Sequence, residues 1–326
     1  MNKYVISEEI KAMIDQKIIS GASWSFVSEE KVENHYAGVM GVQTPFSERK
    51  IEEGLLYDLA SLTKVIGTTT RILQLIDEGS LRFTTAVNEI IPSFTHIQVT
   101  ISDLLLHKGG LPAEFPEKEA ISRDILKKYF AQSCLPKSEY DTVYSDVGFL
   151  LLGEVIKEMD SCSLERSFQK HIFEPLMMKH TGFQPIDKNN AVPTEQTAER
   201  GIIQGEVHDS KAFKMDGEVG SAGLFSTLED VAGFVKAYVT EDRRLFSKSI
   251  FDKLRDTAVN ERTLGWEQKE NSRGRSYLFH TGFTGTSIGL EFEGKNGFIL
   301  LTNRVHPNRK DRGFIEARAA LYTAYF

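Results

Sequence analysis

Apolar and polar positions in the first part of the chain follow the spacing of a helix and then that of strands. Residues 1–23, MNKYVISEEIKAMIDQKIISGAS, have the amphipathic pattern of a short helix. The segments SWSFVS and KVENHYAGV come next and predict a hairpin, with polar residues between its two strands. The run LLYDLA, residues 55–60, is short and extended. This part of the chain therefore predicts one helix, a hairpin and a short strand.

A helical period begins directly after this run. In LTKVIGTTTRILQLIDEGSL, residues 62–81, apolar side chains stand at 62, 65, 66, 72, 73, 75 and 76, and Gly79 provides a stop. The centre of the segment is rich in threonine, which is a weak helix former, so tertiary packing has to stabilise it. We expect a helix with one buried face.

The middle of the chain has helical patterns separated by loops. TISDLLLHKGGLP predicts a capped helix that ends at two glycines, while YSDVGFLLLGEVIKEM and SLERSFQKHIFEPLMM predict two apolar helices. Residues 186–225 are rich in glycine, proline and polar side chains, which predicts a long irregular connection of the kind that is often functional. STLEDVAGFVKAYV then restarts a helix, with Ser226 or Thr227 as its N-cap.

The last part of the chain returns to a strand pattern. SYLFHTG, TSIGLEF and GFILLTN alternate or run apolar between glycine turns, and DRGFIEARAALYTAYF closes the chain as an amphipathic helix. This order predicts an α+β fold, a mainly antiparallel sheet flanked by the N- and C-terminal helices with an inserted helical lobe. Residues 1–80 and 230–326 would form a discontinuous α/β lobe and residues 81–229 the helical lobe, with the active site in the cleft between them.

The composition is that of an ordinary globular protein and argues against several classes of function. The chain has 326 residues and a formal net charge of -7, with 40% hydrophobic and 26% charged residues. It has no dense Lys/Arg stripe, so nothing supports nucleic-acid binding, and no stretch reaches the roughly 18 apolar residues of a membrane segment. No signal peptide is visible, so we expect a cytoplasmic protein from the sequence as written, or an exported one if its start has been trimmed.

Cofactor chemistry has no signal in the sequence. The chain has 2 cysteines, too few for a disulfide framework or a cysteine-built metal site. No glycine loop that could cradle phosphate follows a predicted strand. We expect no cofactor and no metal.

The segment DLASLTKV places Ser61 and Lys64 three positions apart, on one face of the predicted helix. A serine hydroxyl is a poor nucleophile until a base removes its proton, and a lysine can accept that proton only if burial or positive neighbours lower its pKa. The start of a helix also offers backbone N–H groups to a developing oxyanion. The alternative is a helix cap followed by a surface lysine.

Two further polar clusters stand at the borders of predicted elements. VYSDVG, with Tyr144, Ser145 and Asp146, begins the long apolar helix, where a cap alone would explain the serine or the aspartate. HTGFTG, residues 280–285, follows a strand and by itself could be a strand end with a glycine turn. Each cluster is weak alone, but three clusters in this order, with a helical insert between them, favour one catalytic site.

The three clusters resemble the motifs of the serine β-lactamase and penicillin-binding-protein superfamily, most closely its class C β-lactamase, DD-peptidase and esterase branch. SLTK at 61–64 matches Ser-x-x-Lys, and YSD at 144–146 matches Tyr-x-Asn with its last residue changed. HTG at 280–282 matches Lys-Thr-Gly with its first residue changed. The predicted lobes agree with that fold, and the resemblance spans most of the chain.

The resemblance implies a role for each matched residue. Ser61 would be the nucleophile that forms an acyl-enzyme, and Lys64 would accept or relay its proton. Tyr144 would pass a proton to the leaving group and help to activate the deacylating water. The backbone N–H groups of Ser61 and Phe283 would form the oxyanion hole, and Thr281 would line the strand edge where the substrate lies.

Asp146 departs from the family pattern because it places a carboxylate where the family has an amide. If Asp146 approaches Lys64, it favours the ammonium form of the lysine. Lys64 would then act mainly as a charge that lowers the pKa of Tyr144, and the phenolate would be the base. Whether Lys64 or Tyr144 is the general base stays open at this point.

His280, two residues before Gly282, replaces a permanent cation by a group whose unperturbed pKa is about 6.5. A neutral imidazole holds a substrate carboxylate less firmly, which favours esters or amides without an obligatory carboxylate and leaves peptidase activity open. If His280 does contact a carboxylate, binding should weaken as the pH rises above about 7.

Two other signals are weaker. GTSIG, residues 285–289, matches the Gly-x-Ser-x-Gly nucleophile elbow, but Ser287 precedes a strand-like pattern where the elbow needs a helix. His208 and Asp209 in the irregular stretch could be a metal pair, yet no further ligand stands at a recognisable spacing. A hydrogen bond within the loop is the preferred interpretation.

The sequence therefore predicts a serine hydrolase that attacks an ester, amide or β-lactam carbonyl, as a β-lactamase, a D-Ala carboxypeptidase or an esterase does. Its partner would be a small-molecule or peptide substrate, and its oligomeric state is left open. The alternative is a penicillin-binding or non-catalytic recognition protein that acylates without turnover, which the two altered motif residues motivate.

Overall fold

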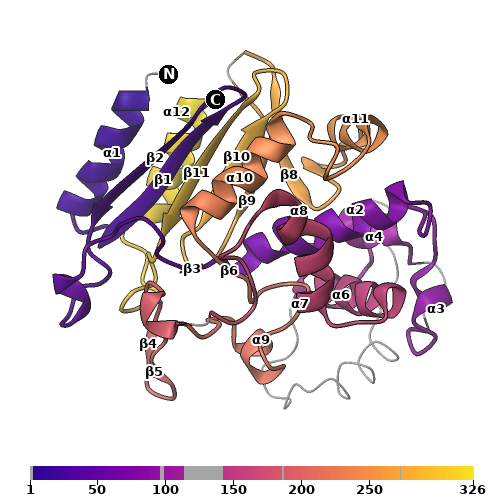
Figure 1. Ribbon diagram of the computed structural model, residues 1–326, viewed down its shortest axis with the longest axis horizontal. Helices are drawn as coiled ribbons and strands as arrows, with labels where there is room; N and C mark the ends of the chain where they lie inside the picture. Colours follow the sequence, from indigo (N-terminus) through magenta and orange to yellow (C-terminus); the bar gives the residue numbers. More distant parts are fainter. Residues whose placement is uncertain (1–2, 96–98, 114–141, 186, 272) are drawn as a thin grey trace.

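A seven-stranded antiparallel sheet forms the centre of the computed structural model, which describes residues 3–95, 99–113, 142–185, 187–271 and 273–326 (Figure 1). The strand order is β2-β1-β11-β10-β9-β8-β7. The strands are β1 (Gly21–Ser28), β2 (Val32–Gly38), β7 (Arg262–Thr263), β8 (Trp266–Glu270), β9 (Ser276–Thr281), β10 (Ser287–Glu291) and β11 (Asn296–Thr302). The predicted α+β class, with its hairpin near the N-terminus and its C-terminal strands, is confirmed.

The sheet joins the two ends of the chain. β1 pairs with β11 from Ala22 to Ser28, so that Trp24 lies opposite Leu300 and Phe26 opposite Phe298. The sequence pattern does not predict β7 and β8, because WEQKE in β8 has a single apolar residue and β7 is only two residues long. They form one edge of the sheet, where β8 pairs with β9 and β7 pairs with β8.

Helices cover both faces of this sheet (Figure 1). The helix α1 (Lys3–Asp15) packs beside α12 (Phe314–Tyr325) on one face, as the sequence predicts, and α10 (Leu228–Val239) packs on the other. Ile6, Ile10 and Met13 of α1 are buried at helical spacing against this face. Each such buried apolar side chain contributes about 1.5–3 kcal/mol to folding.

The remaining helices lie mostly to one side of the sheet, beneath α10 in the view of Figure 1. They are α2 (Thr70–Asp77), α3 (Val87–Ile90), α4 (Ile101–Leu105), α6 (Asp146–Asp160), α7 (Leu164–Phe168), α8 (Glu174–Leu176), α9 (Ser210–Lys214) and α11 (Lys248–Asp256). Short strands β3 (Tyr57–Asp58) and β6 (Phe225–Ser226) pair with each other, as do β4 (Gln196–Thr197) and β5 (Gly201–Ile202). The exact division of the chain into two lobes stays a prediction.

Within the described ranges, every helix is too short or too polar to cross a bilayer. The cytoplasmic location stays a prediction of the sequence.

The segment that follows Ser61 differs from the single helix with one buried face that the sequence predicts. A 3₁₀ turn at Ala60–Leu62 leads into a π-helical stretch at Lys64–Thr69 and then into α2, and every residue from 62 to 75 is buried. The threonines explain the departure, because Thr68 Oγ1 donates to the carbonyl of Gly220 at 2.7 Å and Thr70 Oγ1 to that of Val65 at 2.8 Å. Their hydroxyls thus find buried partners that a regular, half-exposed helix would not offer.

Candidate active site

Ser61 lies in a turn that a buried carboxylate holds in place. Ala60, the residue before it, has a φ of 47°, in the left-handed region that is unfavourable for alanine. Asp58 offsets this cost, because its Oδ1 accepts the N–H of Ala60 at 2.8 Å and its Oδ2 accepts the N–H of His208 at 2.6 Å. Burial raises the pKa of Asp58, while these two N–H groups favour its ionised form. Asp58 therefore holds the turn that contains Ser61 and links it to the backbone at His208.

The connection between β9 and β10 is fastened to the same turn. Thr284 Oγ1 donates to the carbonyl of Asp58 at 2.8 Å, and Thr286 Oγ1 donates to that of Leu59 at 3.0 Å. Gly282 permits this approach, because a Cβ at this position would lie 2.5 Å from the Leu59 carbonyl oxygen. Phe283, on this connection, thus lines the same pocket as Ser61.

Lys64 contacts three oxygen atoms. Its Nζ lies 2.9 Å from Ser61 Oγ, 2.8 Å from the carbonyl oxygen of Ser221 and 2.7 Å from Asp146 Oδ1. The lysine side chain is completely buried. An ammonium group has three N–H donors and no lone pair, so three acceptors at these distances match the protonated form.

The charges around Lys64 agree with this geometry. Burial alone would lower its pKa, but the negative charge of Asp146 and hydrogen bonding from Asp146 and Tyr144 outweigh burial and raise the pKa above the usual range. Asp146 responds in the opposite direction, since Lys64 and Lys211 hold its pKa below the ordinary value in spite of burial. The sequence led us to expect that Asp146 would favour the ammonium form of Lys64 if the two side chains approached each other. In the structure they do approach each other.

Ser221 reaches the lysine because the loop backbone runs unusually close to α6. Gly220 lies against the carbonyl of Phe149, and a Cβ on this glycine would collide with that oxygen. In the sequence this stretch is GSAGLF, part of the predicted irregular connection. The contact of a backbone carbonyl with Lys64 could not be predicted from these residue types.

Tyr144 lies in a cluster of rings and charges beside this lysine. The Lys64 Nζ is 5.3 Å from the centroid of the Tyr144 ring, and the Arg262 guanidinium is 5.1 Å from it. The ring of His107 lies 4.6 Å away and that of His280 6.2 Å away, centroid to centroid. The three motif segments thus come together, with Tyr144 between the nucleophile turn and β9.

His107 was not singled out from the sequence, although it positions this cluster. Its Nδ1 accepts the backbone N–H of Ser145 at 3.0 Å, and its ring packs against Tyr144. Ser145 in turn caps α6 by accepting the N–H of Gly148 at 3.2 Å, as the sequence allows. His107 belongs to HKGGLP, whose glycines were the only visible signal.

His280 is a neutral, buried side chain. Its Nδ1 lies 3.1 Å from the carbonyl oxygen of Thr281. Burial lowers its pKa well below the ordinary value, and the charges of Lys64 and Arg262 lower it further. The imidazole is therefore already neutral near pH 7. The pH-dependent binding of a carboxylate that the sequence suggested for His280 has no physical basis here.

Ser61 lines two adjoining pockets. The first, of about 320 Å³, is lined by Ser61, Tyr144, Arg262, Glu267, His280, Thr281, Gly282, Phe283, Arg304, Ile315 and Arg318. The second, of about 260 Å³, is lined by Ala60, Ser61, Tyr144, Asp146, His208, Asp209, Ser210, Lys211, Ala222, Phe283 and Arg309. Seven of the eight residues that the sequence proposes for the site line one or both pockets. The eighth, Lys64, is buried beneath them.

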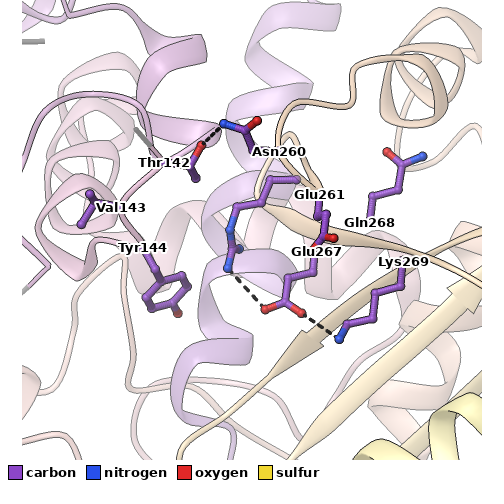
Figure 2. A pocket seen from close by; sticks show the side chains of 9 residues that line it. Thr142, Val143, Tyr144, Asn260, Glu261, Glu267, Gln268 and Lys269 are labelled. Carbon is purple, nitrogen blue, oxygen red and sulfur yellow. Dashed lines mark hydrogen bonds and ion pairs between the residues drawn. The ribbon is translucent and has the colours of Figure 1, made fainter. Parts of the chain in front are cut away.

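Tyr144 also borders a larger hollow of about 680 Å³ next to the first pocket (Figure 2). Figure 2 shows Tyr144 on one side of it and Glu267 and Lys269, from β8, on the other. Asn260 donates to Thr142 at 3.2 Å across its far end. A substrate that reaches Ser61 therefore has room to extend past Tyr144 along the sheet edge.

The first pocket is positively charged, although the chain as a whole is negative. Arg262, Arg304 and Arg318 line it together with one acid, Glu267, which pairs with Arg262 at 3.3 Å. In the described part of the chain, neither Arg304 nor Arg318 forms an ion pair; Arg304 Nε donates to the Phe283 carbonyl at 3.1 Å. Burial lowers the pKa of Arg318, and the charge of Arg304 lowers it further. These arginines come from three distant segments, so no motif revealed them.

The weaker sequence signals take structural roles. Ser287 is fully buried within strand β10, which excludes a nucleophile elbow there. His208 Nε2 lies 3.0 Å from Glu195 Oε2, a contact within the irregular stretch, and its ring stacks on Phe283. Asp209 caps α9 by accepting the N–H of Ala212 at 2.8 Å. Among the described residues, no group of three or more His, Cys, Asp and Glu side chains could hold a metal ion.

Comparisons with known proteins extend over nearly the whole chain. The family model described as Beta-lactamase matches residues 6–322. The N-acetylmuramyl-L-alanine amidase of Bacillus subtilis (strain 168) is 28% identical, covering 90% of this chain and 76% of that protein. A protein of Escherichia coli (strain K12) assigned as a D-alanyl-D-alanine carboxypeptidase is 27% identical, covering 90% and 77%. The class C beta lactamase from Rhodobacter sphaeroides superposes with a TM-score of 0.79 at 16% identity and covers 99% of each chain.

Proposed function

The chain belongs to the beta-lactamase family and is a serine hydrolase, and we propose that it works through an acyl-enzyme on Ser61. The observation that carries this proposal is the contact of Lys64 Nζ with Ser61 Oγ at 2.9 Å, at the junction of two pockets. Tyr144 lines both pockets and lies beside the lysine. One nucleophile, one fixed cation and one phenol thus share a small space open to substrate.

In the proposed acylation, Lys64 stays an ammonium and Tyr144 is the base. The positive charge beside the phenol stabilises negative charge on its oxygen, so Tyr144 can take the Ser61 proton as Oγ attacks the substrate carbonyl carbon. The carbonyl oxygen becomes an oxyanion, which the backbone N–H groups of Ser61 and Phe283 would stabilise. Within the described residues the Phe283 N–H has no other acceptor, which supports this role.

The tetrahedral intermediate then collapses. The bond to the leaving group breaks as Tyr144 returns its proton to that group, which leaves an ester on Ser61. For deacylation Tyr144 takes a proton from water, the hydroxide attacks the ester carbonyl, and the proton returns to Ser61 Oγ as the acid product leaves. No group beyond the chain's own residues and water takes part in either half-reaction.

The substrate class we propose is an acyl compound that carries a carboxylate, as a D-alanine-terminated peptide or a β-lactam does. The support is the charge of the first pocket, where Arg304 and Arg318 face the same space as Ser61 and Thr281. This revises the preference for esters or amides without an obligatory carboxylate that the change to His280 suggested, because arginines supply the cation that position 280 lacks. The assigned activity of the Escherichia coli relative agrees with this class.

A substrate panel tests the proposed function. The wild-type protein and Ser61→Ala are each incubated with a chromogenic ester, a cephalosporin and a peptide ending in D-Ala-D-Ala. We expect turnover of at least one carboxylate-bearing compound by the wild type and none by the variant. A lasting one-to-one adduct without turnover would support the alternative of a penicillin-binding protein, and neither turnover nor adduct would overturn the proposal.

A further inference from the structure

Lys211 places a second ammonium group on the carboxylate that holds Lys64. Its Nζ lies 3.2 Å from Asp146 Oδ2, while Asp146 Oδ1 lies 2.7 Å from Lys64 Nζ. Lys211 is mostly buried, with 12% of its side chain exposed, and lines the second pocket beside Ser61. Asp209, the N-cap of α9, lies 3.5 Å from the same Nζ and helps to aim it. One carboxylate is thus shared by two lysines from different elements.

We propose that Lys211 is a positioning residue for acylation, which orients Asp146 and offsets its charge so that Lys64 stays in contact with Ser61. The inference rests on the proposed function of Ser61. The argument concerns net charge, because the family motif has a neutral amide where this chain has Asp146. An aspartate paired with a lysine is also neutral in sum, so Lys211 compensates for a change made 65 positions away in the sequence.

The groups around this carboxylate and its lysine limit what can titrate. Among the described residues, the groups that face Asp146 and Lys64 are Tyr144, His107, His280, Arg262, Lys211 and Asp209. Burial holds the pKa of both histidines well below the ordinary value, so they stay neutral through the working range. Within the described part of the chain, the acidic limb of acylation therefore reports the base of the proposed mechanism and neither histidine.

The test is a charge cycle on the acidic limb of the acylation rate. Lys211→Met removes a positive charge, which makes the base harder to deprotonate, so the limb moves to higher pH by about 0.5–1 unit and the rate below it falls roughly 3- to 10-fold. Asp146→Asn moves the limb to lower pH. The double variant, in which the two charge changes cancel, returns close to the wild-type limb.

Two further variants separate positioning from folding. Lys211→Arg keeps the charge and restores most of the wild-type rate. Lys214→Met makes the same substitution at an exposed position of the same helix and leaves the limb unchanged. Circular dichroism spectra recorded for every variant check that α9 and its surroundings remain folded.

The outcomes distinguish the two claims. A wild type that acylates normally, with an unmoved limb in Lys211→Met and a double variant whose limb stays where that of Asp146→Asn lies, overturns the role of Lys211 alone. A wild-type protein that forms no adduct on Ser61 with any compound of the panel overturns the proposed function, and this inference with it.

Discussion

The Nζ atom of Lys64 lies 2.7 Å from Asp146 Oδ1 and 2.9 Å from Ser61 Oγ, so one buried ammonium joins a fixed negative charge to the nucleophile. A buried cation without a partner would lose its proton, because burial penalises charge. The carboxylate prevents this loss and thereby supports one of the two candidate bases that the sequence left open. In the mechanism we propose, Lys64 supplies charge and Tyr144 moves the proton.

Replacing Asp146 by asparagine tests this choice. The carboxylate raises the pKa of Lys64, so Asp146→Asn lowers it and brings the loss of the ammonium into the accessible pH range. We expect the acylation rate of the wild type to stay level up to about pH 10, whereas the variant loses rate on the basic side at lower pH. If Lys64 were the base, the variant would keep its full rate on the basic side with no new basic limb, and that result would contradict our assignment.

Arg318→Gln tests the substrate class. A charge-assisted hydrogen bond to a carboxylate is worth about 1.5 kcal/mol, so we expect KM for a D-Ala-D-Ala peptide to rise about 10-fold with little change in kcat. For the same peptide with a C-terminal carboxamide, we expect KM of the wild type and KM of Arg318→Gln to be nearly the same. Arg312→Gln, at an exposed neighbouring position, is the matched control. An equal loss for both peptides would show that Arg318 does not bind the carboxylate.

Asp58→Asn tests how the nucleophile turn is held. Each oxygen of Asp58 accepts a backbone N–H, so an amide group at this buried position places one donor against another. We expect the free energy of unfolding to fall by about 2–4 kcal/mol, measured by urea denaturation, together with a loss of kcat. Asp256→Asn, an exposed substitution of the same kind, should change stability by less than about 0.5 kcal/mol. Equal stability of the two variants would contradict this account.

Glu195 makes a pH-dependent contribution to stability. Hydrogen bonds from Arg309 and His208 outweigh burial and lower the pKa of Glu195 to about 2. A depressed carboxyl pKa stabilises the fold above the unfolded value, near 4.3, and this contribution fades as the pH falls toward the folded value. We expect Tm of Glu195→Gln to lie about 2 °C below the wild type at pH 7, with the gap shrinking by pH 3. A gap that is constant between pH 7 and pH 3 would contradict the ion-pair explanation.

The sequence predicted those features that lie in short continuous stretches. SLTK, YSD and HTG each hold their residues within four positions, and the two predicted terminal helices form as α1 and α12. Residues that act from a distance had no such pattern. Lys211 is placed at the site by the fold of the 186–225 stretch, and Arg318 by the position of α12. In a sequence, a lysine or arginine on a helix cannot be told from an ordinary surface residue.

The helix after Ser61 shows a different limit. Its apolar spacing was correctly helical, but the pattern could not show that the polar side of the segment is buried too. Threonine hydroxyls that bond to Gly220 and Val65 satisfy that side, and both acceptors are backbone carbonyls. Hydrogen bonds to the backbone leave no trace in residue types, so the π-helical stretch was beyond prediction.

Mass spectrometry of the acylated protein tests the central claim most directly. The wild type and Ser61→Ala are mixed with a slowly released β-lactam, quenched in acid and digested. We predict that the wild type gains the mass of one acyl group, that the modified peptide contains Ser61, and that the variant gains nothing. An adduct of equal yield on the variant, or one located on another residue of the wild type, would show that the hydroxyl beside Lys64 is not the nucleophile.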